Sequence, residues 1–234
     1  MAIIYGQPDS EKRFLRKLPD KVEKLGDISQ VHQELKHEFD SIEDNGLKNK
    51  FNRWRKKRQI NKIEEHKESS LHKGAKGELR VLDKLSQLSN DFHVMCGVYM
   101  DLGEYVSYNG KWNLRSAQMD YVVVSKRGVV QIEVKNWSPD FSKQHKGFSP
   151  FEQTDRAGRV LWIALQDWLS PKNPPVTNVL LSIGGNLQYN SNYKYVNVKD
   201  LNNINNFIEN RYEKFSDKEV KRLVGRIKGH VTKG

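Results

Sequence analysis

The chain of 234 residues is long enough for one large domain or for a domain of ordinary size with an accessory region, and we favour the second. Hydrophobic residues make up 36% and charged residues 29%, a polar balance that permits a buried core and indicates some exposed helix. The formal net charge of +11 favours an acidic polymer as partner, with nucleic acid ahead of an anionic membrane surface.

Two broad classes are excluded by what the sequence lacks. Cys96 is the only cysteine, so an internal disulfide and a CxxC zinc site are ruled out. Residues 1–13 lack the apolar core of a signal peptide, and no run approaches the roughly 20 apolar residues that span a bilayer. We therefore expect a cytoplasmic protein with no membrane partner.

The N-terminal part is predicted to be helical. Residues 10–25 form at best a short helix that Pro19 interrupts. A better helix is expected from Asp27, as its cap, to Ile42, because apolar residues recur there at spacings of three and four. Asn45 and Gly46 then end this helix.

Residues 47–68 are predicted to form a helix in which basic and aromatic side chains alternate. The basic residues that we assign to nucleic-acid binding are Arg53, Arg55, Lys56, Lys57 and Arg58. In this interpretation they contact phosphates while Trp54 stacks on a base. The alternative is a solvated face, with Phe51, Trp54 and Ile60 packed on the core.

The character of the sequence changes at about residue 71. An amphipathic helix is predicted there, ending near residue 90, with Glu78 close to its start and with Gly74 and Gly77 permitting close approach of the backbone. Glu78 is a candidate site residue, and the alternative is that it only interacts with the positive end of the helix dipole. A strand over residues 92–102, with Gly97 as a bulge, and a polar hairpin over residues 104–115 follow.

The most informative segment is a β-hairpin within residues 116–137. Residues 120–125 form one strand, and residues 129–135 alternate apolar and charged side chains as a second strand does. An even-numbered loop places Asp120 opposite Glu133 or Lys135, on the same face of the sheet. Two acids would then converge with a lysine, and paired carboxylates favour a hard divalent cation such as Mg²⁺ or Mn²⁺ between them.

A helix starting at residue 149 or 150 follows a lysine- and glycine-rich loop over residues 138–148, in which His145 is given no role. This helix carries Gln153 on a polar side with Arg156 and Arg159, which are candidates for contact with a DNA backbone or parts of an exposed face. Strands are predicted over residues 177–183 and 193–198, with a turn at residues 184–186. Two helices with a basic tail complete the chain.

These motifs resemble the nuclease-related domain (NERD) family of the PD-(D/E)xK nuclease superfamily. The matching stretches are Lys76-Gly77-Glu78, residues 118–124 around Asp120, Ile132-Glu133-Val134-Lys135-Asn136 and Pro150-Phe151-Glu152-Gln153. The resemblance spans residues 71–198, and the order of four motifs is more specific than an isolated ExK.

The resemblance implies a metal-dependent nuclease. Asp120, Glu133 and the backbone carbonyl of Val134 would bind Mg²⁺ or Mn²⁺, with Glu78 as a further candidate ligand. Lys135 would orient the attacking water or stabilise charge on the phosphorane, and Gln153 would support the site from behind. DNA is the expected substrate. The alternatives are RNA as the substrate, a nucleic-acid-binding module without catalysis, and a structural salt bridge between Glu133 and Lys135.

The order of elements after residue 71 predicts an α/β fold with a mixed sheet flanked by helices, and the resemblance implies the restriction-endonuclease-like arrangement of that core. We divide the chain into a basic helical region over residues 1–70, the nuclease-like core over residues 71–200, and helices over residues 201–234 that pack on the core or on a second subunit. A homodimer and a separately encoded partner protein are both left open.

Overall fold

The computed structural model describes residues 1–137, 149–169, 173–184, 187 and 189–232. It divides into a sheet unit, made of Met1–Asp9 and Gly77–Gly234, and a helical unit, Ser10–Lys76. The unit boundary therefore lies inside a helix and not at residue 70 as predicted, and the first nine residues belong with the sheet. Among the described helices none is long and apolar enough to cross a membrane.

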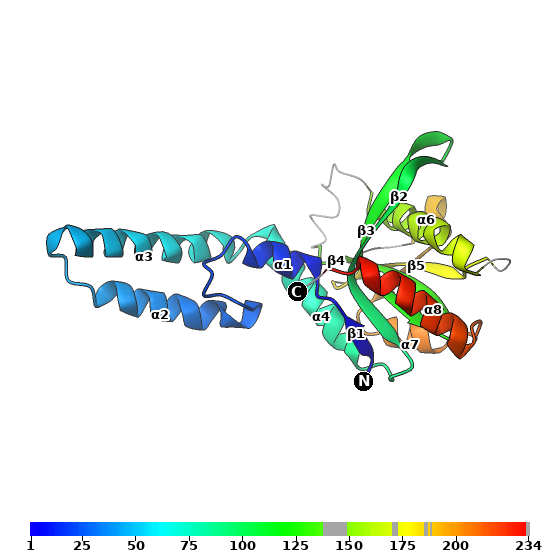
Figure 1. Ribbon diagram of the computed structural model, residues 1–234, viewed down its shortest axis with the longest axis horizontal. Helices are drawn as coiled ribbons and strands as arrows, with labels where there is room; N and C mark the ends of the chain where they lie inside the picture. The colour runs from blue at the N-terminus through cyan, green and yellow to red at the C-terminus, as the bar shows by residue number, and fades with distance from the viewer. Residues whose placement is uncertain (138–148, 170–172, 185–186, 188, 233–234) are drawn as a thin grey trace. The chain divides into compact units, whose positions relative to one another are not determined.

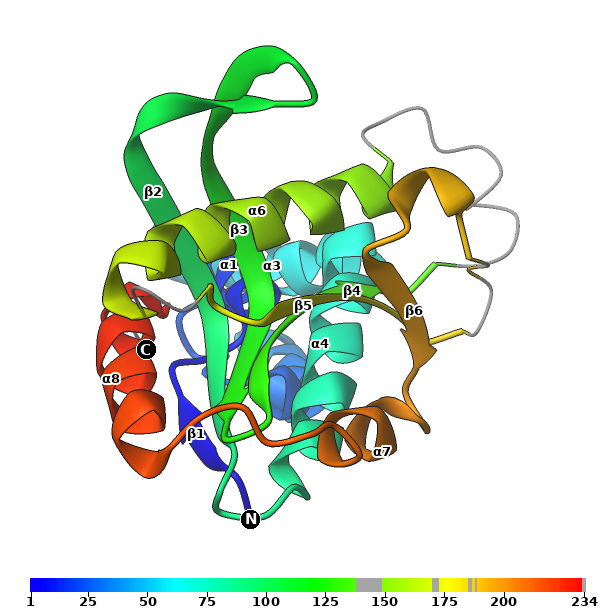
Figure 2. The ribbon, with the colours of Figure 1, turned by 90° about the vertical axis from the view of Figure 1, so that its right-hand side faces the viewer.

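A mixed sheet is the centre of the sheet unit (Figure 2). Its strands are β1 (Ile3–Tyr5), β2 (His93–Tyr108), β3 (Lys111–Ser125), β4 (Gly128–Lys135), β5 (Val176–Ser182) and β6 (Val196–Asp200). They lie side by side in chain order, and the three strands β2, β3 and β4 form an antiparallel meander. Strand β1 pairs in parallel with β2, and β5 and β6 continue the sheet in parallel from β4. The predicted mixed α/β fold is confirmed, whereas β1 was missed.

Helices cover both faces of this sheet. Helix α6 (Pro150–Leu169) and helix α8 (Asp217–Ile227) share one core with Val122 and Val129, while α4 (Ser70–Ser86) and α7 (Ile204–Glu209) share the other core with Val130 and Ile132. Figure 2 shows α6 and α4 on opposite sides of the strands. Short 3₁₀ helices lie at Ser191–Tyr193 and Lys228–His230. Because α7 and α8 are buried in these cores, the C-terminal helices pack on their own chain.

The helical unit has its own small core. It contains α1 (Asp9–Leu15) from Ser10 onward, a 3₁₀ turn (Leu25–Asp27), α2 (Ile28–Asp40), α3 (Gly46–His66) and the first turns of α4. Figure 1 shows α2 and α3 side by side, and the predicted apolar stripe of α2 supplies the buried residues Ile28, Val31 and Leu35. Asp27 does precede α2, but its carboxylate accepts the backbone N–H of Lys24 and makes no cap to α2.

Two details of β2 and β3 differ from prediction. Strand β2 continues to Tyr108, and the predicted tip at Asn109 and Gly110, both with positive φ, joins it to β3. The register across Gly97 is continuous, so no residue is inserted there, and the register shifts occur further on, between Asp101 and Ser107. Gly97 instead has φ +60°, and a Cβ at this position would lie 2.4 Å from Thr232 Oγ1. The glycine therefore accommodates the C-terminal segment.

Candidate active site

The hairpin of β3 and β4 forms as predicted. Its turn holds two residues, Lys126 and Arg127, between the paired Ser125 and Gly128, and the ladder runs to Tyr121 opposite Ile132. Extending this register by one residue brings Asp120 level with Glu133, the first of the two predicted alternatives. Because Ile132 and Val134 contribute to the core under α4, the alternation along the strand directs Glu133 and Lys135 to the face covered by α6.

Asp120 lies at the point where the β3–β4 ladder ends. Its Oδ2 accepts a hydrogen bond from the backbone N–H of Val134 at 2.7 Å, so the carboxylate extends the pairing beyond the last strand partner. Burial raises the pKa of Asp120, although the Val134 N–H and the charge of Lys135 act against the rise. The charge of Asp9, at the start of α1, raises this pKa further. Sequence analysis missed Asp9 because over a hundred residues separate it from Asp120 in the chain.

Lys135 connects Glu133 on its own strand to Gln153 on α6. Its Nζ donates to Glu133 Oε1 at 2.7 Å and to Gln153 Oε1 at 3.0 Å. The ammonium also lies 5.7 Å from the centre of the Trp137 ring. Gln153 lies in the first turn of α6, which begins at Pro150, and its side-chain oxygen connects this helix to the lysine.

Glu133 is only 3% exposed, and this burial has the largest effect on its pKa. Burial raises the pKa of Glu133 from its ordinary 4.5 to about 8, and the negative charge of Asp120 adds to the rise. The Lys135 ammonium opposes it through its charge and its hydrogen bond. The buried Glu133 and the half-buried Asp120 thus interact with one lysine, and a second positive charge would stabilise their ionised forms.

Glu78 lies in the middle of α4 and not near its start. The helix begins at Ser70, two turns before Glu78, so the helix dipole, which acts within the first turn, does not explain this residue. Glu78 is 5% exposed, its backbone carbonyl accepts the Tyr121 hydroxyl at 2.7 Å, and its charge contributes to a Cys96 pKa that burial raises to about 12. Tyr121 and Cys96 line the core on the α4 face, opposite to Glu133.

Gly77 permits close approach of the α4 backbone to its neighbours, as predicted. A Cβ there would lie 2.9 Å from Ile183 Cδ1 and 3.0 Å from Asn136 Cβ, so α4 runs directly against the residues that follow β4 and β5. Gly74 has no such role, because a Cβ there would meet only Ser10 Oγ, at 4.0 Å. The close approach of α4 therefore depends on Gly77 and brings this part of the helix to the end of β4.

The two arginines of α6 differ. Arg156 donates to the Asn113 carbonyl at 2.6 Å and lies 4.9 Å from the centre of the Tyr108 ring, so it is held against the β2–β3 hairpin. Arg159 is exposed, and its guanidinium lies 4.5 Å from the centre of the Trp162 ring. Only Arg159 presents a guanidinium without a hydrogen-bond partner among the described residues.

The basic residues of α3 likewise include some with partners in the chain and some that are exposed. Arg53 donates to the Ile42 carbonyl at 2.7 Å, and Lys56 forms an ion pair with Glu38. The exposed residues are Arg55, Lys57 and Arg58. Phe51 and Trp54 are 60% and 55% exposed, so they are not packed on the core as the solvated-face alternative required, whereas Ile60 is buried.

The donor set fits a hard divalent cation. The carboxylates of Asp120 and Glu133 and the carbonyl of Val134 are all oxygen donors, the type that Mg²⁺ and Mn²⁺ prefer. Burial is the main cause of the raised pKa values of both acids, so a bound cation would stabilise their ionised forms. Among the described residues no third His, Cys, Asp or Glu joins them in a metal-binding cluster, so Glu78 does not lie in one cluster with both acids. The loop of residues 138–148, with His145, lies outside the described residues.

Comparison with known families supports this architecture. Residues 73–182 match the model of the nuclease-related domain, a span that contains the β3–β4 hairpin and the start of α6. Neither the comparison with curated proteins nor the one with solved structures found a match. The matched segment carries all four motifs on the elements just described. The nuclease-related domain is thus the family whose model this chain matches, over residues 73–182.

Proposed function

We propose that the protein is a metal-dependent nuclease that hydrolyses phosphodiester bonds of DNA. The observation that carries the proposal is the convergence of two carboxyl groups with raised pKa values, the half-buried Asp120 and the buried Glu133, on one lysine at the end of β4. Perturbed acids of this kind concentrate at functional sites. The match of residues 73–182 to the model of the nuclease-related domain supports the same reaction class.

Asp120, Glu133 and the Val134 carbonyl would hold Mg²⁺ or Mn²⁺, with Glu78 as an outlying candidate. The ion supplies a Lewis acid for the scissile phosphate and lowers the pKa of a water molecule bound to it. The fold contributes position: the Val134 N–H fixes one oxygen of Asp120 through the 2.7 Å hydrogen bond and leaves its other oxygen to a ligand. The burial of Glu133 keeps water away from its charge and strengthens its interactions.

Lys135 is the residue that we assign to the attacking water or to the charge that develops on the phosphate oxygens. Its ammonium has three donors, of which Glu133 and Gln153 accept two. One N–H is left for a water molecule or a phosphate oxygen. Gln153 is a positioning residue, because it holds the ammonium from the side of α6 and has no other assigned task.

A cleavage assay tests the proposal. Supercoiled, linear and single-stranded DNA, and RNA, are incubated with the protein in Mg²⁺, in Mn²⁺ or in EDTA. The isosteric variants Asp120→Asn and Glu133→Gln are compared with Glu104→Gln, which makes the same change at an exposed acid of the β2–β3 hairpin. Thermal unfolding confirms that each variant is folded.

We expect metal-dependent cleavage of DNA that falls at least about a hundredfold in both site variants and is unchanged in Glu104→Gln. Cleavage that persists in EDTA, or that survives Asp120→Asn, would contradict the assignment. Cleavage of RNA in preference to DNA would keep the site and change the substrate.

A module that binds nucleic acid without cleaving it is the second candidate. The ion pair between Lys135 and Glu133, at 2.7 Å, favours it, because the pair satisfies both charges within the chain. This candidate predicts salt-sensitive binding of DNA with no cleavage in any metal. In that case Asp120→Asn would alter the stability of the protein and leave DNA binding as it is.

A further inference from the structure

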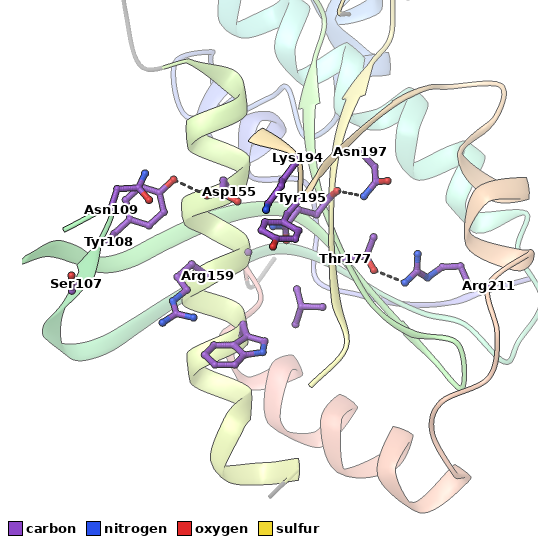
Figure 3. A pocket seen from close by; sticks show the side chains of 14 residues that line it. Ser107, Tyr108, Asn109, Asp155, Arg159, Thr177, Lys194, Tyr195, Asn197 and Arg211 are labelled. Atoms are coloured by element: carbon purple, nitrogen blue, oxygen red, sulfur yellow. Dashed lines mark hydrogen bonds between the residues drawn. The ribbon is translucent and has the colours of Figure 1, made fainter. Parts of the chain in front are cut away.

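A pocket of about 710 Å³ lies away from the acids, where α6, the start of β5 and the segment before β6 meet (Figure 3). Asn178 in its lining pairs with Gln131, two residues before Glu133 and four before Lys135 on β4. At about 3.3 Å per residue, the pocket is roughly 7 to 13 Å further along the strands than the acids. None of the acids or Lys135 lines it.

Positive charge dominates the lining. Arg159 comes from α6, Lys194 from the segment before β6 and Arg211 from the segment after α7, and Figure 3 shows all three around the pocket. None of them forms an ion pair with a described carboxylate. The one acid in the lining, Asp155, already accepts the Tyr108 hydroxyl at 2.7 Å. The pocket is therefore suited to an anion.

Arg211 is the most unusual of the three cations. It is half-buried, its Nη2 donates to the Thr177 hydroxyl, and its Nε is buried with no hydrogen-bond partner among the described residues. Burial lowers the pKa of this guanidinium, and no neighbouring carboxylate compensates. A buried cation without a counter-ion costs free energy, so an anion in the pocket would stabilise the folded chain.

Aromatic rings accompany the two exposed cations. The Arg159 guanidinium lies 4.5 Å from the centre of the Trp162 ring, and Lys194 Nζ lies 5.0 Å from the centre of the Tyr195 ring. Aromatic faces stack on nucleobases of any sequence, at about 1 to 3 kcal/mol per base. The amides of Asn178 and Asn197 add hydrogen-bonding groups to the same pocket. An anion that also carries a planar heterocycle matches this combination.

We propose that this pocket binds a nucleoside phosphate, with the phosphate bound by cations of the lining and the base against the aromatic rings. The ligand is either a free mononucleotide or one nucleotide of a bound strand. The proposal extends beyond the nuclease function and is independent of it, because binding here requires neither the metal nor hydrolysis.

The test is a titration of the full chain in EDTA, so that nuclease activity plays no part. Adenosine 5′-monophosphate, cytidine 5′-monophosphate, adenosine and inorganic phosphate are added separately to ¹⁵N-labelled protein, and the Trp162 indole and Asn197 amide signals are followed. The double variant Arg159→Gln/Lys194→Gln removes the two exposed cations. Lys218→Gln/Arg222→Gln removes the same charge from the exposed side of α8 and serves as the control.

We expect saturable shifts with both nucleotides, weaker binding of adenosine and of phosphate alone, and a loss of affinity of about tenfold or more in the Arg159→Gln/Lys194→Gln variant. The control variant should bind as the wild type does. No saturable binding of nucleotides at millimolar concentration, or equal loss in both double variants, would overturn the proposal. Equally tight binding of inorganic phosphate would overturn the nucleoside part of it.

A competition experiment separates the two sources of the ligand. A single-stranded oligodeoxynucleotide is added, in EDTA, to protein loaded with adenosine 5′-monophosphate. Displacement at concentrations below those of the mononucleotide supports a pocket that holds a unit of a strand, whereas retention supports a free mononucleotide. Failure of the cleavage assay leaves both readouts intact, so the two proposals succeed or fail separately.

Discussion

Two parts of helix α6 differ in how the neighbouring charges are paired. At its beginning, Gln153 and Glu133 both accept hydrogen bonds from Lys135, so the lysine has partners within the chain. Near its middle, Arg159 lines a pocket with Lys194 and Arg211, and no described carboxylate pairs with any of the three. Both regions lie on the same face of the sheet and are built on the same helix.

This contrast separates two uses of a charged side chain. A partner within the fold fixes the position of a charge, which catalysis requires, because the group must stand at a defined point when the substrate arrives. A cation without a partner is a binding group, since its counter-ion has to come from a ligand. The number of partners that a charged residue has within the chain therefore indicates whether it is fixed for catalysis or available to bind a ligand.

The largest effect is expected where a fixed charge is removed. Lys135→Met should reduce cleavage by about a hundredfold or more, because the site then loses the ammonium that orients the attacking water or stabilises the developing charge. Gln153→Leu should reduce it by about tenfold, since the ammonium keeps its bond to Glu133 and loses only its support from α6. Single-turnover cleavage of DNA in Mg²⁺ measures both. If Gln153→Leu proves as damaging as Lys135→Met, Gln153 contacts the substrate directly and is not a positioning residue.

A second large effect concerns pH. The pKa of Glu133 is raised from 4.5 to about 8 in the folded protein, so between these pH values the folded state binds more protons than the unfolded state. In EDTA the free energy of unfolding should therefore fall as the pH rises from 5 to 8, by an amount on the order of a few kcal/mol. Urea unfolding at both pH values measures this fall.

Glu133→Gln is the control for this pH dependence. The variant has no ionisable group at the position, so its free energy of unfolding should change less between pH 5 and 8. Mg²⁺ should restore stability to the wild type at pH 8, because a cation that binds the ionised acids stabilises the folded state. An equal fall in the variant would assign the pH dependence to another group, with Asp120, whose pKa is also raised, as the next candidate.

Much of the site could be predicted because its residues are close in sequence. Alternation along residues 129–135 identifies the faces of β4, and a two-residue turn fixes the register that brings Asp120 level with Glu133. The start of α6 at Pro150 places Gln153 within reach of Lys135, since proline is favoured in the first turn of a helix. Local rules of strand and turn geometry are sufficient for this part of the molecule.

The rest depends on contacts between distant residues. Strand β1 is three residues long and is defined by its pairing with β2, almost ninety positions later, so no local pattern indicates it. Helix α4 begins at Ser70, two turns before Glu78, although Gly74 and Gly77 are unfavourable inside a helix and made a later start the natural prediction. Arg211, Lys194 and Arg159 line one pocket only because β5 and β6 extend the sheet beneath α6.

Gly158 lines the pocket, and its replacement is expected to have an effect of intermediate size. A Cβ at Gly158 would lie 1.8 Å from Asn178 Oδ1, so Gly158→Ala should displace the Asn178 side chain and destabilise the protein by about 1 to 3 kcal/mol. Gly225→Ala on α8 is the matched control, because a Cβ there meets nothing within 4 Å and alanine should stabilise the helix slightly. Chemical denaturation of both variants measures the difference, and equal stabilities would show that Asn178 can move at little cost.

The smallest effect is expected in α3, which contains the same contrast within one helix. Arg55, Lys57 and Arg58 are exposed, whereas Arg53 and Lys56 have partners in and just after α2. If the exposed cations contact phosphates, replacing all three with glutamine should lower the slope of log affinity against log salt by about 2 to 3 and leave stability unchanged. Replacing Arg53 and Lys56 should instead lower stability by about 1 kcal/mol and keep the slope. Filter binding of DNA at several salt concentrations, with thermal unfolding of each variant, distinguishes the two sets, and an unchanged slope in the triple variant would remove α3 from the nucleic-acid surface.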